Sequence, residues 1–376
     1  MTSKLLSRLG GAWLVLGSIA AHAEYALNLQ TPQDIVAREI YDLHTLILWV
    51  CVGIFVVVFG AMFYSIFKHR KSVGHQAAHF HENTTVEVIW TVIPFLILIG
   101  MAIPATKTVL TMRDTSNPDM TIKVTGYQWK WEYDYIDKEA KGIHFFSTLS
   151  TPRDQIENVS NKEQNYLLEV DNPIVVPTGK RIRLLITAND VIHSWWLPVV
   201  GVKQDAIPGY IKDTWFEVEN PGTYRGQCAE LCGKDHGFMP IVLVAKTPED
   251  YAKWVAAEKA KASTVAEDPN KVYTLDELKT KGEEVFGKNC VACHQATGLG
   301  IPGTFPALNG SKIVNGPMAG HVEIVMNGSQ KNPAMVAFSK QLSDLELAAV
   351  ITYERNAWNN HMGDLIQPSE IKALRK

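Results

Sequence analysis

The apolar residues of the chain fall into three patterns along its length. Near the N-terminus two runs without a charged residue, Leu46–Phe67 and Val88–Thr106, are each long enough to cross a hydrocarbon core of about 30 Å as a helix. From residue 119 to 246, short β-branched segments alternate with turns such as Asn-Pro-Gly, which predicts an all-β domain. Beyond residue 271 the pattern predicts helices, among them His321–Met326 and Asp344–Trp358. The expected fold class is multidomain: a two-helix transmembrane hairpin, an all-β sandwich and an all-α domain.

The two apolar runs predict a hairpin over residues 24–118 with both ends outside the cytoplasm. Lys68, Arg70 and Lys71 directly follow the first run, and positive charge favours the cytoplasmic side. Pro94 and Pro104 interrupt the second run, which membrane helices tolerate when neighbours satisfy the freed carbonyls. Two helices make a small membrane domain, so we expect them to pack against a larger partner.

Residues 1–23 are typical of a signal peptide. Lys4 and Arg8 precede the apolar run Leu9–Ala20, and Ala21-His22-Ala23 provides small residues for cleavage after Ala23. A retained membrane helix is the alternative, although the run is short for one. Either way, the domains that follow the hairpin are expected outside the cytoplasmic membrane.

Charge and cysteine content narrow the class of function. The net charge of −3 argues against a nucleic-acid partner. The chain has five cysteines, of which Cys51 lies inside the first apolar run and the other four form two close pairs. Paired cysteines in an otherwise cysteine-poor chain indicate metal or haem chemistry more than a disulfide scaffold.

The first cysteine pair lies in a segment rich in copper-binding side chains. Thiolate and thioether sulfur stabilise Cu(I), imidazole accommodates Cu(II), and two thiolates can bridge two copper ions. A disulfide between the cysteines is the alternative, but it leaves the nearby imidazole and thioether without a reason. The candidate ligands are Cys228, Cys232, His236 and Met239, with His193 as the second imidazole.

The spacing Cys-Ala-Glu-Leu-Cys-Gly-x-x-His-x-x-Met at residues 228–239 resembles the binuclear copper (CuA) loop of cytochrome c oxidase subunit II. The resemblance covers most of residues 30–245. It implies a cupredoxin sandwich over residues 119–246 whose metal loop joins the last two strands. It also implies that the backbone carbonyl of Glu230 is a weak copper ligand, and that the Glu230 carboxylate binds magnesium shared with subunit I. A solvated surface glutamate is the default alternative for that side chain.

The resemblance assigns roles to two further residues. Trp129, in Gly126-Tyr127-Gln128-Trp129-Lys130-Trp131, corresponds to the family's electron-entry tryptophan. The pattern alone places the aromatics from Tyr127 to Tyr133 on one face of a strand, which would make Trp129 a core residue. Glu87 corresponds to a glutamate at the entrance of a proton path, and its alternative is an interfacial carboxylate that reaches water.

The second cysteine pair predicts a covalent haem. After a linker at residues 247–270, helical over Pro248–Lys261 and flexible over 262–270, comes Cys290-Val291-Ala292-Cys293-His294. Two thioether attachments followed by an axial histidine characterise haem c, and a redox-active thiol pair is the alternative. The expected domain covers residues 271–361, with a tail at 362–376.

The sixth iron ligand requires a methionine downstream. Met326 lies at a core position of the predicted helix, while Met318 follows Gly316-Pro317 in a loop and remains a candidate. Met335 lies in a segment that resembles the Met-Pro-Ala-Phe of class I cytochromes c, although Val336 replaces the usual proline. We therefore favour His294 and Met335 as the axial pair, and a thioether ligand raises the iron potential.

Together these features resemble the electron-transfer subunit of a proton-pumping haem–copper terminal oxidase, a cytochrome-c oxidase, in a bacterial cytoplasmic membrane. The implied path runs from haem c to CuA and on to subunit I, where oxygen is reduced to water. Expected partners are subunit I and the other oxidase subunits, with a soluble cytochrome c or a quinol-oxidising complex as donor. The competing hypotheses are a nitric-oxide reductase subunit, a nitrous-oxide reductase and a copper-delivery protein.

Overall fold

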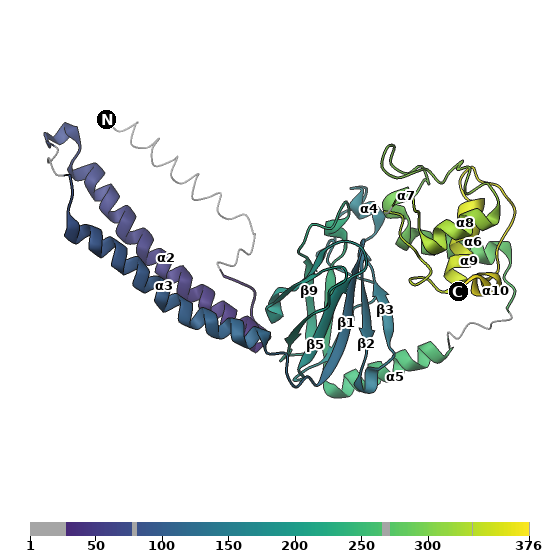
Figure 1. Cartoon of the computed structure of the whole chain (residues 1–376), viewed down its shortest axis with the longest axis horizontal. Coiled ribbons are helices and arrows are strands. Elements are labelled where there is room, and N and C mark those ends of the chain that lie inside the picture. Colours follow the sequence, from purple (N-terminus) through teal and green to yellow (C-terminus); the bar gives the residue numbers. More distant parts are fainter. Residues whose placement is uncertain (1–27, 77–80, 265–270, 333, 376) are drawn as a thin grey trace, which may run out of the picture. The chain divides into compact units, whose positions relative to one another are not determined.

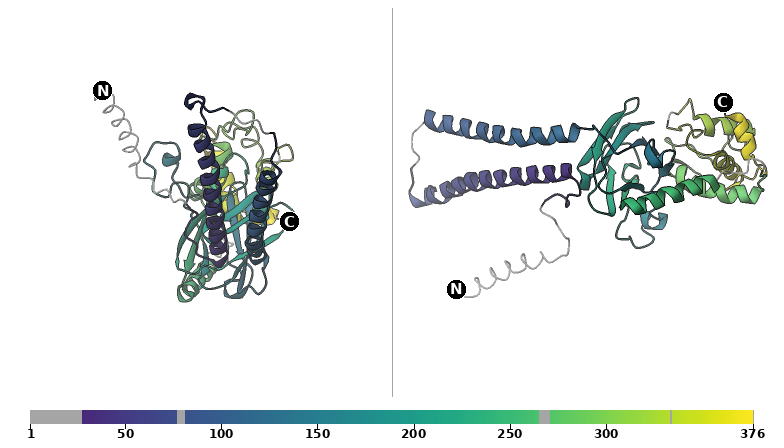
Figure 2. Two further views of the ribbon diagram at one scale, coloured as in Figure 1. Left: turned by 90° about the vertical axis from the view of Figure 1, so that its left-hand side faces the viewer. Right: turned by 90° about the horizontal axis from the view of Figure 1, so that it is seen from below.

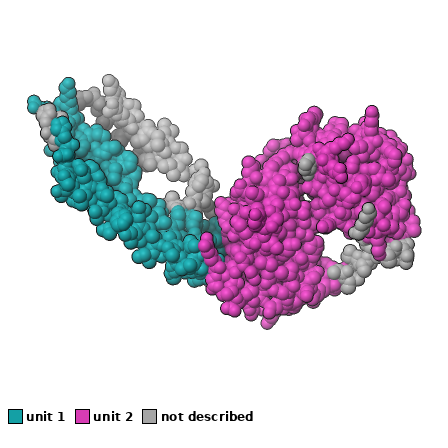
Figure 3. Space-filling model, viewed as in Figure 1, with its two compact units in different colours: residues 1–112, 198–201 teal, residues 113–197, 202–376 magenta. Residues whose placement is uncertain are grey.

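The structure is a computed structural model that describes residues 28–76, 81–264, 271–332 and 334–375. It divides into two compact units, residues 1–112 with 198–201 and residues 113–197 with 202–376 (Figure 3). The expected signal peptide, residues 1–23, lies outside the described residues, as do residues 265–270 of the expected linker.

The first unit contains two long helices that run side by side (Figures 1 and 2). Helix α2 spans Ile35–Lys68 and is capped by the Asp34 side chain, and α3 spans Thr84–Arg113, with a short 3₁₀ turn η2 (Lys71–Val73) between them. Most of their large apolar side chains are exposed. Both helices are long and apolar enough to cross a membrane, as the two uncharged runs predict.

The β domain in the second unit is a sandwich of two five-stranded sheets. One sheet has the order β3-β2-β1-β5-β8 and the other β4-β10-β9-β6-β7, with β1–β5 and β4–β10 parallel and the other pairs antiparallel. The strands are β1 (Met120–Tyr127), β2 (Lys130–Tyr135), β3 (His144–Ser147), β4 (Ile174–Pro177), β5 (Ile182–Ala188), β6 (His193–Leu197), β7 (Val202–Ala206), β8 (Lys212–Phe216), β9 (Gly222–Cys228) and β10 (Ile241–Lys246).

Alternation of side chains explains how the sandwich closes. In β5, Ile182, Leu184 and Ile186 are fully buried, while Arg183 faces outward and pairs with Asp213 of β8. Successive side chains of a strand point to opposite faces, so one face of β5 enters the core. The core includes Trp131 and Trp195, both fully buried.

The aromatic segment from Tyr127 to Tyr133 does not form one strand, so that expectation is wrong. β1 ends at Tyr127 and β2 begins at Lys130, and these two residues pair across a two-residue turn. Gln128 and Trp129 are the two residues of this turn, where the chain reverses direction and does not continue as one strand. Trp129 is therefore only half-buried, at the end of the sandwich, while Trp131 is in the core.

Helix α5 (Pro248–Thr264) follows the sandwich and extends three residues beyond the predicted end at Lys261. The helical domain then comprises α6 (Leu275–Asn289), α7 (Val291–His294), α8 (Met318–Asn327), α9 (Asp344–Asn356) and α10 (Pro368–Leu374). Capping boxes at Thr274/Glu277 and Ser343/Glu346 begin α6 and α9.

Helices α6 and α9 form the centre of this domain. A Cβ on Gly282 of α6 would lie 2.1 Å from the carbonyl oxygen of Ala349 in α9, so only glycine permits this close crossing. Residues 362–376, expected to be a tail, contain α10, whose Ile371 is fully buried in the domain core. Hydrogen bonds between Gln367 and Tyr273 tie that segment to the start of the domain. The expected order of hairpin, β-sandwich and helical domain is confirmed.

Candidate metal and haem sites

The predicted copper ligands converge at one end of the sandwich. His193 begins β6, Cys228 ends β9, and the remaining candidates lie in the loop that leads through η5 (His236–Phe238) to β10. The ligand atoms of His193, Cys228 and Cys232 all lie within 4.8 Å of one another, and all three residues are buried. The loop joins β9 to β10, the last two strands, as the resemblance implies.

The sulfur atoms form the centre of this cluster. The Sγ atoms of Cys228 and Cys232 are 3.9 Å apart, and both residues are free thiols. Sγ of Cys232 is 3.4 Å from Nδ1 of His236 and 3.5 Å from Sδ of Met239. The carbonyl oxygen of Glu230 lies 3.4 Å from Sγ of Cys228, while the Glu230 side chain is exposed. Because a disulfide requires about 2.05 Å between sulfurs, the alternative of a disulfide does not describe this pair.

Asp190, which the sequence analysis does not single out, orients His193. Its carboxylate accepts a hydrogen bond from Nε2 of His193 (2.9 Å) and another from the backbone N–H of Gln128 (2.8 Å). Nδ1 of His193 is buried without a hydrogen-bond partner, and a metal ligand needs a free nitrogen held in place by its other ring nitrogen. A carboxylate three residues before a candidate imidazole ligand is the sequence signal that could have identified Asp190.

Gly126 leaves the space that His193 occupies. A Cβ at this position would lie 2.8 Å from Cδ2 of the imidazole, which is closer than any real contact of that kind. The ring of His193 also meets the edge of Trp131, with ring centroids 5.9 Å apart. Strand β1 therefore contributes a glycine to the site, because the lack of a side chain at Gly126 leaves room for the His193 ring.

The two thiols of the cluster influence each other's ionisation. The hydrogen bond from the Cys232 thiol lowers the pKa of Cys228, and that bond together with burial raises the pKa of Cys232. The pair by itself thus holds one negative charge readily and a second one poorly. Bound metal ions deprotonate coordinating thiols outright. A donor set of two thiols, two imidazoles, a thioether and a carbonyl therefore fits a pair of copper ions.

The haem-attachment residues line a large cavity whose wall is formed by the helical domain and by one end of the sandwich. The cavity has a volume of about 840 Å³, within the range of about 300–1,000 Å³ usual for cofactor sites. Cys290, Cys293, His294 and Met335 all line it. Nδ1 of His294 donates to the carbonyl oxygen of Pro306 (2.9 Å), so the ring is fixed and Nε2 is the nitrogen available for iron.

The other methionines and the thiol-pair alternative fit less well. Met326 is buried in the core, and Met318 packs against that core; neither lines the cavity. Burial raises the pKa of both Cys290 and Cys293, whereas a redox-active thiol pair needs at least one lowered pKa. The geometry thus suits covalent haem attachment and favours Met335 as the second axial ligand.

Trp129 connects the two sites within the second unit. Its indole Nε1 donates to the carbonyl oxygen of Cys232 (3.1 Å), and the neighbouring Gln128 side chain donates to the same oxygen (2.8 Å). Trp129 also lines the cavity that holds Cys290 and Cys293. It is therefore in contact with both a copper ligand and the expected haem pocket.

Two lysines of the sandwich contact the attachment segment, and neither contact is predicted by the sequence pattern. Nζ of Lys130 donates to the side-chain oxygen of Asn289 (2.7 Å), and Nζ of Lys234 donates to the carbonyl oxygen of Ala292 (2.6 Å). Burial lowers the pKa of Lys130 to about 8, and its ammonium group lies over the Phe146 ring. No local pattern marks these lysines, because their partners lie 159 and 58 residues away.

Glu87 lies in the first turn of α3, where its side chain accepts a hydrogen bond from the backbone N–H of Asn83 (3.2 Å). Glu87 is half-buried in the structure.

A membrane-anchored cupredoxin-like sandwich with a sulfur-rich metal loop, followed by a haem-binding domain, defines a membrane-bound copper–haem electron-transfer protein. Comparison with known families specifies the class. Residues 120–246 match the periplasmic domain of cytochrome c oxidase subunit II, residues 22–108 its transmembrane domain, and residues 277–353 the cbb3-type cytochrome c oxidase subunit III family. The chain belongs to the cytochrome c oxidase subunit II family and carries an additional cytochrome c domain.

Named relatives agree with this assignment. The chain is 38% identical over 239 residues to a probable cytochrome c oxidase subunit 2 of Rickettsia bellii, covering 64% of this chain and 86% of that protein. It is 35% identical to cytochrome c oxidase subunit 2 of Metridium senile, covering 65% of this chain and 95% of that protein. A crystal structure of the periplasmic domain of subunit II from Bradyrhizobium japonicum is 45% identical, with a TM-score of 0.35 and coverage of 39% of this chain and 98% of that one.

The family membership confirms several expectations. The chain is a subunit of an enzyme, cytochrome c oxidase, and functions in electron transfer within a haem–copper oxidase alongside other subunits. The family implies CuA copper, and the cytochrome c domain implies haem. It is a membrane protein with a periplasmic domain.

Proposed function

We propose that this subunit carries electrons from a covalent haem c to a binuclear CuA centre and on to subunit I of a proton-pumping oxidase, where oxygen is reduced to water. The single observation that carries the proposal is the position of Trp129, which touches the copper loop at Cys232 and lines the cavity with Cys290 and Cys293.

The chain's own residues hold both cofactors. Cys290 and Cys293 would attach the haem covalently, and His294 and Met335, which line the same cavity, would bind its iron. The copper pair is held by His193, Cys228, Glu230, Cys232, His236 and Met239, with Glu230 contributing its carbonyl. When bound, each cofactor accepts and releases one electron.

The buried setting favours rapid transfer. Asp190 fixes His193, Pro306 fixes His294, and Trp131 donates to the carbonyl oxygen of Met239 (3.2 Å). Ligands held by neighbouring hydrogen bonds keep their positions when the charge of the site changes. Trp129 offers an aromatic group between the cavity and the loop, so the electron need not cross open solvent.

The remaining proposals concern the complex. The exposed Glu230 carboxylate would bind magnesium together with subunit I, since hard oxygen ligands suit that ion. Glu87 would mark a proton-path entrance. The subunit would be a multi-pass protein of a bacterial inner membrane, with the copper and haem domains on the periplasmic side and with the signal peptide 1–23 removed. A soluble cytochrome c or a quinol-oxidising complex would supply the electrons.

Oxidase activity at varied ionic strength tests the proposal. Residues 271–360 carry eight positive and eight negative charges, so the sequence implies no strongly basic docking face for the haem domain. The linker replaces such a face by keeping the haem near the copper at an effective concentration of the order of millimolar. Once haem c has been reduced, the turnover of the complete oxidase should depend only weakly on salt concentration.

Deletion of residues 271–376 provides the comparison. The truncated subunit should retain the CuA signal in electron spin resonance, require added cytochrome c, and lose activity as salt increases. Equal and steep salt sensitivity of both forms would show that the fused haem does not donate to the copper.

A further inference from the structure

The segment that carries Met335 is an irregular part of the haem-cavity wall. Apart from residue 333, the described residues between α8 and α9 form turns and bends, with no helix or strand. Met335, Phe338 and Leu342 of this segment line the cavity together with His294. A metal ligand keeps its position only when neighbouring groups hold it, so contacts from outside the segment have to fix this part of the wall.

The end of α8 holds the upstream half of the segment. A Cβ on Gly328 would lie 2.8 Å from the carbonyl oxygen of Met335, and the φ angle of Gly328 is +78°, so this close approach requires glycine. The backbone N–H of Ser329 donates to the same carbonyl oxygen (2.9 Å). Further along, the backbone N–H of Ser339 donates to the carbonyl oxygen of Met326 (3.1 Å).

A single arginine holds the downstream half. Arg375 directly follows α10, and its guanidinium donates to the carbonyl oxygens of Ser339 and of Leu342, the latter across 2.7 Å. The same guanidinium pairs with Asp344 in the first turn of α9. Arginine carries five N–H donors in a rigid fork, so one side chain can meet three acceptors at once. Arg375 does not line the cavity and therefore holds the wall from outside.

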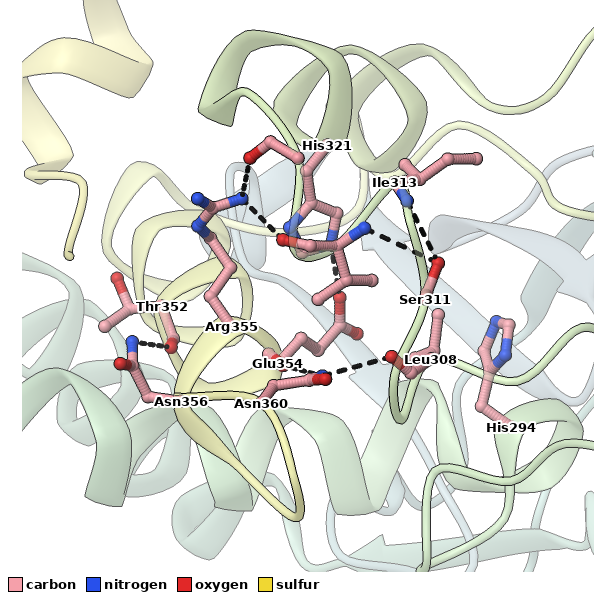
Figure 4. Close-up of polar contacts among 12 residues, drawn as sticks. His294, Leu308, Ser311, Ile313, His321, Thr352, Glu354, Arg355, Asn356 and Asn360 are labelled. Atoms are coloured by element: carbon pink, nitrogen blue, oxygen red, sulfur yellow. Dashed lines mark hydrogen bonds and ion pairs between the residues drawn. The ribbon is translucent and has the colours of Figure 1, made fainter. Parts of the chain in front are cut away.

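Another irregular segment of the cavity wall is held by the same chemistry. Arg355, which is fully buried, donates to the carbonyl oxygens of Val314 (2.5 Å) and Gly316 (3.0 Å) and pairs with Asp364 (Figure 4). Backbone carbonyls need hydrogen-bond partners where no helix or strand supplies them. In both places an arginine paired with an aspartate provides those partners, so the side chains that fix this cavity are arginines outside the ligand set.

We propose that Arg375 is a positioning residue for the haem iron, because its guanidinium fixes the segment that keeps Met335 in place as the axial ligand. The inference rests on the covalent haem c and the Met335 ligand of the proposed function. Without the guanidinium, the carbonyls of Ser339 and Leu342 lose their partner and the segment opens more easily. Residues 362–375 are then part of the haem site and not only of the domain core.

The consequence for the haem has a definite sign. A thioether ligand raises the iron potential, so weaker ligation by Met335 should lower the midpoint potential. Hydrogen bonds from a charged donor are strong, and losing those of Arg375 should weaken the ligation equilibrium on the order of tenfold. Hydroxide displaces the thioether from oxidised iron as pH rises. With one hydroxide bound per thioether displaced, a tenfold weaker ligation lowers the pH of half-displacement by about one unit.

The experiment compares Arg375→Gln and Arg375→Lys with the unaltered subunit in the purified oxidase. Near-infrared magnetic circular dichroism follows the charge-transfer band of methionine-ligated oxidised haem during a pH titration, and a redox titration gives the midpoint potential. In Arg375→Gln we expect the band to be lost about one pH unit lower and the potential to fall, with the haem still covalently attached. Arg375→Lys keeps a charge for Asp344 but loses the fork, so it should lie between the two.

Lys372→Gln is the matched control, because it removes a positive charge from an exposed position of α10. It should behave like the unaltered subunit in both titrations. Equal shifts in Lys372→Gln and Arg375→Gln would assign the effect to the lost charge and overturn the inference. An unchanged band and potential in Arg375→Gln, with only easier unfolding in denaturant, would give Arg375 a purely structural role and overturn it as well.

Two further comparisons keep the result decisive. If Arg375→Gln does not fold, Arg375→Lys is read by the same band and potential, and values equal to those of the unaltered subunit would contradict the inference. Met335→Leu tests the proposed function separately. A retained band in Met335→Leu would refute the axial assignment and the inference with it. Loss of the band there, with no change in Arg375→Gln, would refute the inference alone.

Discussion

The indole nitrogen of Trp129 donates a hydrogen bond to the backbone carbonyl of Cys232 across 3.1 Å. This bond joins the turn of the β1–β2 hairpin to a cysteine of the metal loop, 103 residues later in the chain. The same tryptophan lines the cavity with the haem-attachment cysteines. Two sites that are far apart in sequence therefore share one aromatic residue.

Replacing this tryptophan should slow electron transfer without unfolding the protein. Trp129→Phe keeps an aromatic ring but removes the N–H donor, at a cost of about 1 kcal/mol in the free energy of unfolding. We expect slower copper reduction after photochemical reduction of the haem, with unchanged haem and copper spectra. An unchanged rate would show that electrons bypass Trp129.

The copper ligands should differ in importance. Cys228→Ser or Cys232→Ser removes a bridging thiolate and should abolish the multi-line signal of one electron shared by two copper nuclei, while the haem spectrum persists. Met239→Leu should shift the potential more than the occupancy, because an axial thioether is a weak ligand. Electron spin resonance and copper analysis decide the matter. An emptied site in Met239→Leu, together with a full site in Cys232→Ser, would reverse the assigned roles.

Lys130 should stabilise the contact between the hairpin turn and the attachment segment. Lys130→Met preserves much of the side chain's volume but removes the hydrogen bond to Asn289. We expect slower haem-to-copper transfer and a normal CuA signal. Lys141→Met, at an exposed position of the same sandwich, is the control and should behave like the unaltered protein. Identical rates in the two variants would remove Lys130 from the electron-entry region.

The pair of His144 and Glu132 should make stability depend on pH. The hydrogen bond from His144 to Glu132 (2.7 Å) raises the pKa of His144 above 6.5. Burial raises the pKa of Glu132, but the contact with His144 and the other hydrogen bonds of Glu132 lower it by more, so it lies below 4.5. The histidine contribution is complete below pH 6.5 and is lost as pH rises through the raised pKa, while the glutamate contribution is complete above pH 4.5 and is lost as pH falls through the lowered pKa.

A double-mutant cycle measures this effect. The His144 side chain is 46% exposed, so solvent screening limits the coupling to about 0.5–1 kcal/mol. Denaturant unfolding of His144→Gln, Glu132→Gln and the double variant should give that coupling near pH 5.5 and a smaller one at pH 9. A coupling that grows with pH would contradict the assigned charge states.

Local spacing was enough to predict the ligand groups. Cys228, Cys232, His236 and Met239 lie within twelve residues, and Cys290, Cys293 and His294 within five, so one segment carries most of each donor set. The uncharged runs likewise predict α2 and α3, because membrane spans require length and apolarity only.

Long-range partners could not be predicted in the same way. The hairpin at Gln128–Trp129 interrupts what looks like a continuous aromatic alternation, and its turn is defined by pairing of Tyr127 with Lys130 and not by glycine or asparagine. Lys130–Asn289 and His321–Glu354 connect residues 159 and 33 positions apart. Nothing in the sequence near either residue indicates the other, since both pairs arise only when the elements pack.

Time-resolved reduction of the haem in the intact oxidase tests the central claim most directly. A short pulse of reductant is given at several protein concentrations and two salt concentrations, and the CuA band is followed after the haem band. The account predicts that copper is reduced at the rate at which haem is reoxidised, with a first-order constant independent of protein concentration and only weakly dependent on salt. Copper reduction that accelerates with protein concentration, or that precedes haem reoxidation, would show that electrons do not pass from the fused haem to the copper within one chain.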